Sequence, residues 1–205
     1  DDSDGDMALA VNDMAIYDHM TPDFLRQRLD YINHADLVVV ETNLPEPSLH
    51  WLCEHCTAPL LADPVSTIKA PKLKPVLGRL TALKPNRIEA ELLSGVTIQT
   101  DADAARAAEK LLETGLRQVY ISLGSDGLYA ADREGHTARV ACPKIQVANA
   151  TGGGDAAAAA LAACIAHGKP LAEAARLAIG AGALACTASE TIHPGMSWEN
   201  IRYIL

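Results

Sequence analysis

The sequence predicts an α/β protein with a mostly parallel central sheet that is covered by helices on both faces. Short apolar segments alternate along the chain with longer segments of helical character, which is the pattern of βα units. The run Leu37–Val40 is continuously apolar, as is typical of a strand buried on both faces. Several of these segments end in polar or glycine residues, and open sheets of this class bind ligands beyond the carboxyl ends of their strands.

Composition narrows the function further. The chain has 205 residues, 49% of them hydrophobic and 21% charged, which fits one globular domain over residues 1–205. Its net charge of −9 argues against a nucleic-acid partner, because proteins that bind nucleic acids gather Lys and Arg on the binding surface. We find no uninterrupted apolar stretch of membrane length and expect no membrane partner. The five cysteines are an odd number without a framework spacing, so we expect a reducing, cytoplasmic location.

The first residues predict half of a β-hairpin. Asp4-Gly5 is a hairpin-turn dipeptide, and Met7–Val11 follows it as a strand. The other arm would precede residue 1, so we expect that the natural protein begins upstream and that residues 1–15 are a remnant of a larger lid. The unpaired strand edge left behind would favour a homodimer.

The first half of the chain then alternates between helices and strands. Thr21 is an N-cap with Pro22 at the first helical position, and the helix that follows carries an apolar stripe from Phe24 to Ile32. The next elements are expected in the order strand 37–40, helix 47–56, strand 59–62, helix 71–78 and strand 80–83. Each of these strands is a short apolar run, and each of these helices begins at or next to a proline.

The second half contains the better-marked helices. Helices 86–94 and 101–114 end at Gly95 and Gly115, residues suited to the left-handed conformation that closes a helix. Strand 119–123 follows, and Glu134-Gly135 separates two arms of a hairpin at 128–130 and 137–140. Two Ala-rich helices over 154–167 and 170–188 complete the expected order.

The strongest chemical motif is the stretch from Asn149 to Asp155, which contains three consecutive glycines at the start of a helix. Backbone N–H groups without covering side chains, together with the positive end of the helix dipole, form an anion site. Asp155 falls in the first turn beside that site, where a carboxylate could accept a proton from an attacking hydroxyl. The simpler alternative is a glycine turn in which Asp155 only interacts with the helix dipole. No Gly-Lys-Ser/Thr follows, so this is not a Walker A loop.

Two further motifs stand where strands end. Asn86 and Glu89 could organise a hydrated Mg²⁺ ion, but Asn followed three residues later by Glu is also a helix capping box, which is the more economical reading of that pair alone. The segment Ser122–Gly127 contains glycines that would let a nucleotide approach the backbone, although a plain turn has the same composition.

Taken in order, these motifs resemble those of the ribokinase-like (PfkB) carbohydrate kinases. Thr151–Asp155 is similar to the family's C-terminal signature, Asn86–Glu89 to its Asn-x-x-Glu metal motif, and Ser122–Gly127 to its nucleotide-binding strand end. The resemblance covers essentially the whole chain and implies a ribokinase-like fold, with the nucleotide and catalytic part over residues 80–205. It also implies ATP as phosphoryl donor and Mg²⁺ as cofactor.

The resemblance assigns roles to individual residues. Asp155 would be the general base, and the amides of Gly152, Gly153 and Gly154 would form the anion hole. Asn86 and Glu89 would organise Mg²⁺, largely through water. Nucleotide contacts would come from Asn86, Ser122, Gly124, Gly127 and Thr151. A monovalent cation such as K⁺ would lie beside the glycine loop, near the carbonyls of Asn149 and Thr151 and the segment Ala185–Glu190, although Asn149 stands where many members have Asp.

Within that family, the segments Asp63–Ser66, Lys84–Glu91 and Gly5–Met14 look most like those of pseudouridine kinases. This implies a small-molecule acceptor, the 5′-hydroxyl of pseudouridine. Family members carry further chain upstream with most of the sugar-contacting residues, so we expect this chain by itself to be weakly active or inactive. The alternatives are a kinase for another sugar or nucleoside and a non-catalytic nucleotide-binding module. A dinucleotide-binding oxidoreductase fits poorly, because its glycines would follow the first strand.

Overall fold

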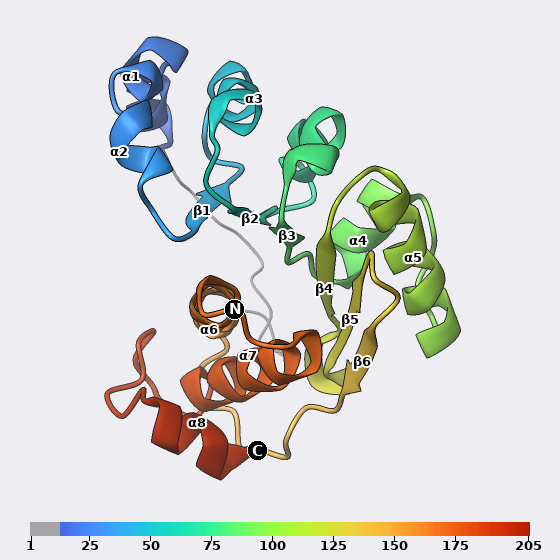
Figure 1. Ribbon diagram of the computed structural model, residues 1–205. Helices are drawn as coiled ribbons and strands as arrows, with labels where there is room; N and C mark the ends of the chain where they lie inside the picture. The colour runs from blue at the N-terminus through green and yellow to red at the C-terminus, as the bar shows by residue number, and fades with distance from the viewer. Residues whose placement is uncertain (1–12) are drawn as a thin grey trace.

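A computed structural model describes residues 13–205, and it contains one mixed sheet of six strands in the order β1-β2-β3-β4-β5-β6 (Figure 1). The first four strands pair in parallel, and the last two add an antiparallel hairpin. The strands are β1 (Val38–Glu41), β2 (Leu60–Asp63), β3 (Ala82–Leu83), β4 (Gln118–Ser122), β5 (Leu128–Asp132) and β6 (Thr137–Val140). The expected order of strands and the hairpin are confirmed.

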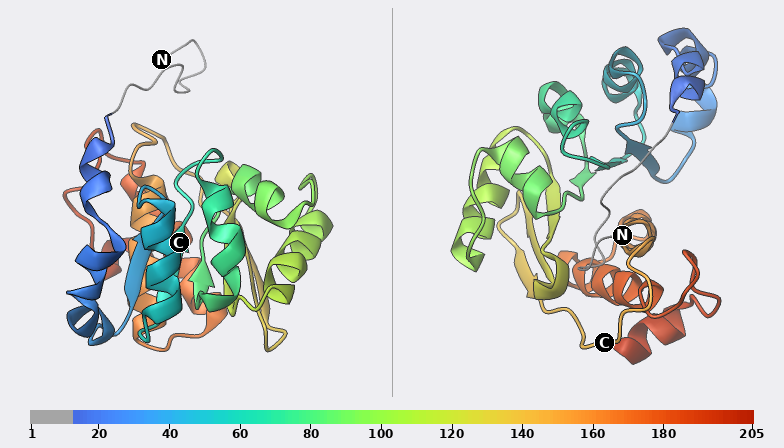
Figure 2. Two further views of the ribbon diagram at one scale, coloured as in Figure 1. Left: turned by 90° about the horizontal axis from the view of Figure 1, so that it is seen from above. Right: turned by 180° about the vertical axis from the view of Figure 1, so that it is seen from behind.

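Helices lie on both faces of this sheet (Figure 2). The N-terminal helices and α3 to α5 cover one face, and α6 to α8 cover the other, each layer enclosing its own apolar cluster. The helices are η1 (Ala15–His19), α1 (Pro22–Arg26), α2 (Leu29–Asn33), α3 (Glu46–His55), η2 (Ala70–Arg79), α4 (Arg87–Ser94), α5 (Asp101–Glu113), η3 (Gly124–Asp126), α6 (Gly153–Ala166), α7 (Leu171–Ala185) and α8 (Trp198–Ile204). The predicted α/β class with a mostly parallel, doubly covered sheet is confirmed.

Three helical predictions need adjustment. The helix after Pro22 is divided into α1 and α2, with Gln27 and Arg28 between them. The segment around Pro71 forms the 3-10 helix η2, which contains Pro75; a proline inside a helix removes one backbone donor and crowds the preceding turn. The C-terminal helix α8 was not predicted, although Ser197 caps it by accepting a hydrogen bond from the Asn200 N–H at 3.2 Å.

The prediction that strand 37–40 is buried on both faces is wrong. Val40 is buried against the α3 side, whereas Val39 points to the opposite face and is 51% exposed. Its register partner Leu61 on β2 is fully buried beneath the α6–α8 layer. The α6–α8 layer therefore covers β2 but not the edge strand β1. An apolar run in the sequence does not show which faces of a strand other elements cover.

Two further predictions concern the N-terminal strand and membrane-spanning helices. The predicted strand Met7–Val11 lies outside the described residues. Within residues 13–205, none of the helices combines the length and the apolar character needed to cross a lipid bilayer.

Candidate active site

The carboxyl ends of the parallel strands meet along one edge of the sheet. Glu41 and Asp63, the last residues of β1 and β2, are register partners. Asn86, which follows β3, and Ser122, the last residue of β4, form an isolated parallel bridge, and the Ser122 N–H donates to the Pro85 carbonyl at 2.9 Å. The sheet therefore brings the predicted metal motif and the predicted nucleotide loop into contact.

Asn86 and Glu89 form the capping box at the start of α4. The Asn86 Oδ1 atom accepts from the Glu89 N–H at 2.9 Å, and Glu89 Oε2 accepts from the Asn86 N–H at 2.9 Å. The capping interpretation is therefore confirmed. Each side chain keeps further oxygen lone pairs outside these bonds, so water-mediated binding of a hard cation remains compatible with the cap.

The electrostatics of Glu89 distinguish it from an ordinary cap. Its side chain is buried, with 2% exposed. Burial raises the pKa of the Glu89 carboxyl above its ordinary value; the Asn86 N–H opposes that shift, the Asp63 carboxylate adds to it, and the Lys84 ammonium opposes it. Glu89 therefore belongs to a charged cluster with Asp63 and Lys84 at the site edge of the sheet.

The loop after β4 is held by arginines and shaped by glycines. Arg87 pairs with Asp126 at 2.6 Å, which ties the loop to the start of α4. Gly127 has φ of 103°, and a Cβ there would lie 2.0 Å from the Val140 carbonyl oxygen, so this glycine is required by the neighbouring strand. Gly124 has φ of 63° and open space around its missing side chain.

The three glycines at the start of α6 have different surroundings. Gly152 is the N-cap with φ of 88°, and a Cβ there would meet the Thr191 carbonyl oxygen at 2.3 Å. A Cβ on Gly153 would lie 2.8 Å from the Cys186 sulfur. Gly154 has room for a Cβ, whose nearest neighbour would be the Lys84 ammonium nitrogen at 3.9 Å. Gly152 and Gly153 thus serve close packing, and Gly154 leaves space beside a cation.

The first turn of α6 leaves backbone donors free. Gly152 provides no side-chain cap, and the first intrahelical bond is the one from the Ala156 N–H to the Gly152 carbonyl at 2.9 Å. Within residues 13–205, the amides of Gly154 and Asp155 have no protein acceptor. Free donors and the helix dipole are the features that suit an anion, so the anion site expected from the sequence stays a prediction at this position.

Asp155 is the third residue of α6 and is exposed at that open helix end. In the described part of the chain its carboxylate accepts no hydrogen bond and forms no ion pair. A carboxylate with free lone pairs next to unsatisfied amides has the chemistry required of a general base beside a phosphoryl group.

A cavity of about 590 Å³ joins these elements. Five predicted residues line it, namely Ser122, Gly124, Gly127, Gly153 and Gly154. Its remaining walls include apolar side chains from residues 142–147 and from α7. The volume is that of a small-molecule site, and mostly apolar walls with a few polar groups are typical of such sites. Thr151, Gly152 and Asp155 lie next to this wall in sequence but do not form part of it.

Lys84 and Asp63 border the candidate site, and the sequence reasoning gave neither of them a role there. Lys84 lines the same cavity, and its ammonium nitrogen lies 3.0 Å from an Asp63 carboxylate oxygen. Among the described residues, the buried charged side chains are Lys84, Glu89 and Asp132, so two of them belong to this site. Buried charges are costly unless paired, and they concentrate at functional sites. The available signal was the position of Lys84 at a strand end directly before the Asn86 motif.

Asn149 joins the two segments for which a monovalent cation was predicted. Its side-chain amide donates to the Ser189 carbonyl at 3.0 Å, and its Oδ1 atom accepts from the Thr151 N–H at 2.9 Å. The segment around Cys186 is also bonded to residues 148 and 149 through backbone N–H groups. The predicted carbonyl-bearing segments therefore adjoin, with the Asn149 side chain committed to holding them together.

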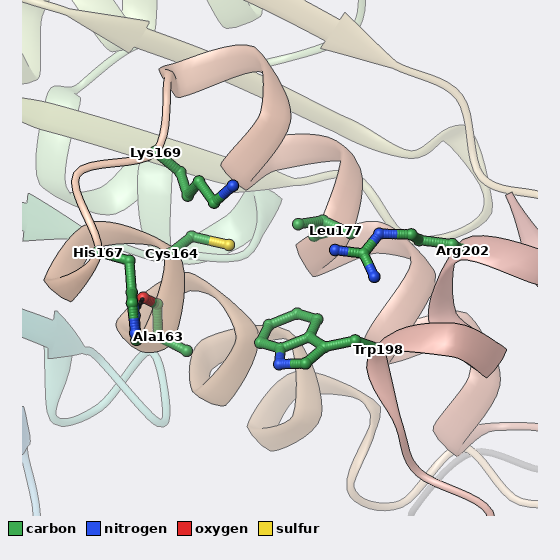
Figure 3. Close-up of a pocket in the computed structure, with 7 residues that line it drawn as sticks. All are labelled: Ala163, Cys164, His167, Lys169, Leu177, Trp198 and Arg202. Atoms are coloured by element: carbon green, nitrogen blue, oxygen red, sulfur yellow. Dashed lines mark hydrogen bonds between the residues drawn. The ribbon is translucent and has the colours of Figure 1, made fainter.

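A second cavity lies at the opposite end of α6 (Figure 3). It measures about 130 Å³ and is enclosed by α6, α7 and α8, with Lys169, Trp198 and Arg202 among its walls. It is too small for a nucleotide and is separated from the glycine turn by the length of α6, roughly 20 Å at 1.5 Å per residue. We therefore assign no part of the active site to it.

Comparison with known proteins gives a consistent result. The profile of the pfkB family of carbohydrate kinases matches residues 1–198. The pseudouridine kinase of Escherichia coli (strain K12) is 37% identical over 201 residues, which are 98% of this chain and 64% of that protein. The chain thus spans less than two thirds of that relative.

Two solved structures share the fold. Ribokinase from Arabidopsis thaliana, complexed with ribose and ATP, has a TM-score of 0.72 at 22% identity, covering 87% of this chain and 58% of that one. Phosphofructokinase-2 from Escherichia coli in complex with potassium has a TM-score of 0.77 at 22% identity, covering 90% of this chain and 62% of that one. At this identity the likeness shows the ribokinase-like fold.

Proposed function

The chain belongs to the pfkB family of carbohydrate kinases, and from this premise we propose that it carries the phosphoryl-transfer centre of an ATP-dependent pseudouridine kinase. The observation that carries the proposal is the open start of α6, where amides without an acceptor and an Asp155 carboxylate without a bonding partner, both within residues 13–205, lie together. This combination supports phosphoryl transfer because such catalysis depends on positioning and on stabilising negative charge.

In the proposed reaction, Asp155 accepts a proton and the amides at the start of α6 bind the transferred group. The nucleoside 5′-hydroxyl attacks the γ-phosphorus of ATP, and its proton passes to the Asp155 carboxylate. The new oxygen–phosphorus bond forms as the bond to the bridging β,γ-oxygen breaks, which releases ADP. The amides at the start of α6 donate to the phosphoryl oxygens and stabilise the charge that develops on them.

The residues at the site edge fit Mg²⁺ as the metal cofactor. Asn86 and Glu89 offer oxygen atoms beyond those used in the capping box, and oxygen ligands with several retained waters are what this ion prefers. When bound, Mg²⁺ would neutralise charge on the β- and γ-phosphates. The protein's own contribution is to hold both side chains rigidly through the cap.

A monovalent cation forms a separate part of the proposal. The segment near Asn149 and Thr151 adjoins the segment around Ser189, and carbonyl oxygens from both would be its ligands. We propose K⁺ for this position, with support from a neighbour of the same fold that contains potassium. The expected result is activation by K⁺ over Na⁺ at equal ionic strength.

Pseudouridine is the acceptor supported by the relative that is 37% identical over nearly the whole chain. The test is transfer of labelled γ-phosphate from ATP to pseudouridine, uridine and ribose by the natural protein, with Asp155→Asn as the variant. We expect transfer to pseudouridine by the natural protein and loss of transfer in the variant.

The acceptor panel distinguishes the alternatives. Transfer to another sugar or nucleoside that still depends on Asp155 would contradict pseudouridine as the acceptor and would support the proposed mechanism. Nucleotide binding without transfer to any acceptor would contradict the kinase proposal and favour a non-catalytic nucleotide-binding module.

A further inference from the structure

A buried lysine faces the open start of α6 from across the cavity. The Lys84 side chain is 7% exposed, and its ammonium nitrogen would lie 3.9 Å from a Cβ on Gly154. It lines the cavity together with Gly153 and Gly154. The start of α6, whose Gly154 amide has no acceptor among residues 13–205, and this ammonium group therefore border the same space.

The ammonium group has donor capacity to spare. In the described part of the chain its side-chain partner is Asp63, at 3.0 Å, whereas an ammonium group carries three donors. Burying a lysine with a single acidic partner is unfavourable compared with an apolar pair of similar volume. The presence of the Lys84–Asp63 pair beside the start of α6 is explained if an anionic ligand binds the Lys84 ammonium group during function.

Asp63 is itself fixed by the loop that follows β2. Its Oδ1 atom accepts from the Val65 N–H at 2.9 Å, while Oδ2 contacts Lys84. Val65 has φ of 62°, which is rare for a β-branched residue, and the Ser66 N–H donates across it to the Pro64 carbonyl at 2.6 Å. This tight turn holds the carboxylate and so limits where the ammonium group can lie.

From this geometry we propose that Lys84 is a catalytic residue that contacts the phosphoryl group being transferred, and that Asp63 is the positioning residue that orients it. The inference rests on the proposed function and extends it to a side chain outside the glycine turn. A fixed cation opposite the backbone amides would bind the γ-phosphate from the other side, in a site where burial strengthens electrostatic interactions. The ligand class is a nucleoside triphosphate, distinguished from a diphosphate by that terminal group.

The test is binding of Mg²⁺ with ADP or with a non-hydrolysable ATP analogue, measured by calorimetry. Lys84→Met keeps the side-chain volume but leaves Asp63 unpaired, so the double variant Lys84→Met/Asp63→Asn is included to remove the orphaned charge. We expect both to lose about tenfold or more in affinity for the analogue and less than about threefold for ADP. Lys169→Met, at the far end of α6, serves as the control and should bind both nucleotides as the wild type does.

The outcomes separate the two proposals. If the double variant melts as the wild type does and still binds the analogue with wild-type affinity, Lys84 has a structural role only. An equal loss of affinity for ADP and for the analogue would also overturn the γ-phosphate contact. If the wild type binds neither nucleotide, the proposed function fails, and the assignment of Lys84 fails with it.

Discussion

Helices α4 and α6 both begin at the edge of the sheet that carries the candidate site, and both have an acidic residue at their third position, yet the two helix starts are built in opposite ways. In α4, Asn86 and Glu89 satisfy each other's backbone N–H groups. In α6, Gly152 offers no side chain, and among residues 13–205 the amides of Gly154 and Asp155 have no acceptor and the Asp155 carboxylate has no bonding partner. Helix α5 begins as α4 does, with Thr100 and Asp103 in a second capping box. We call a helix start with a capping box a closed end and the start of α6 the open end.

The comparison shows that the N-cap residue determines what the third-position acid can do. The Asp103 carboxylate accepts from the Thr100 N–H and hydroxyl, both at 2.8 Å, and from the Gln99 N–H at 3.1 Å. The bond from the Thr100 hydroxyl, followed by the backbone bonds, lowers the pKa of Asp103. Asp155, with a glycine N-cap, accepts no such bond from the described residues, which suits the proposed role toward a substrate. A closed end stabilises the fold, whereas an open end can bind an anion.

The largest expected effect comes from Asp155→Asn. Because the amide keeps the shape but cannot accept a proton, phosphoryl transfer should fall by roughly a thousandfold, within the range observed for lost general bases. The melting temperature should change little, since the carboxylate contacts no other described side chain. Initial rates with saturating ATP and thermal unfolding test both parts.

Asp103→Asn provides the matched control. The same substitution at the third position of α5 weakens the capping bonds, so it should lower the free energy of unfolding and leave the rate per folded molecule unchanged. Equal rate losses in Asp103→Asn and Asp155→Asn would contradict the distinction between open and closed ends.

The second prediction concerns the glycines of the open end. Gly154→Ala has room for its methyl group but places it in the space between Lys84 and the helix, so nucleotide affinity should fall by about tenfold. Its stability should hold or rise, by up to about 1 kcal/mol, because alanine favours a helix.

Gly153→Ala gives the contrasting case. Its Cβ would lie 2.8 Å from the Cys186 sulfur, so this variant should lose about 1–3 kcal/mol of stability. Calorimetric binding and denaturant unfolding separate the two variants. A stable Gly154→Ala protein with unchanged nucleotide affinity would show that this space is not the phosphate site.

The third prediction tests whether the closed end of α4 has a second role. Asn86→Ala removes the cap and should cost about 1 kcal/mol, whereas Asn86→Ser retains a capping oxygen and should cost much less. If Asn86 also helps to hold Mg²⁺, the serine variant should need several times more Mg²⁺ for half-maximal activity. An unchanged Mg²⁺ requirement in the serine variant would mean that Asn86 is a cap alone.

The smallest effect concerns thiol chemistry at the cavity. Cys142 and Cys186 line it, and burial raises the pKa of both thiols above the ordinary 9.0. Alkylation requires the thiolate, so labelling should be slow at pH 8 and should accelerate as the pH rises. Bound nucleotide should slow the labelling of these two cysteines by a few-fold and leave Cys56 unaffected. Equal protection at Cys56 would indicate a global effect.

The sequence predicted the local backbone features around the candidate site well. The capping pair Asn86 and Glu89, the glycine closure at Gly95 and the glycine start of α6 all depend on neighbours within a few residues, and each lies within a residue or so of its expected place. The strand order of the hairpin followed from the turn at Glu134-Gly135 in the same way.

Features that depend on distant segments were not predictable in this way. The Lys84–Asp63 pair joins the ends of two strands, and the unusual φ of Val65 depends on the turn that fixes Asp63. The exposure of Val39 depends on where the α6–α8 layer ends. Apolar periodicity reports burial along one element and carries no information about which element covers it.

The central claim is that the open start of α6 is where a nucleotide's terminal phosphate binds. The most direct measurement is the change in backbone amide NMR signals when Mg²⁺ and a non-hydrolysable ATP analogue are added to the ¹⁵N-labelled protein. The account predicts the largest shifts at Gly154 and Asp155, with little change at Asp103 in the closed end of α5. Shifts centred instead on Lys169 and Arg202, around the cavity of Figure 3, with none at Gly154, would contradict it.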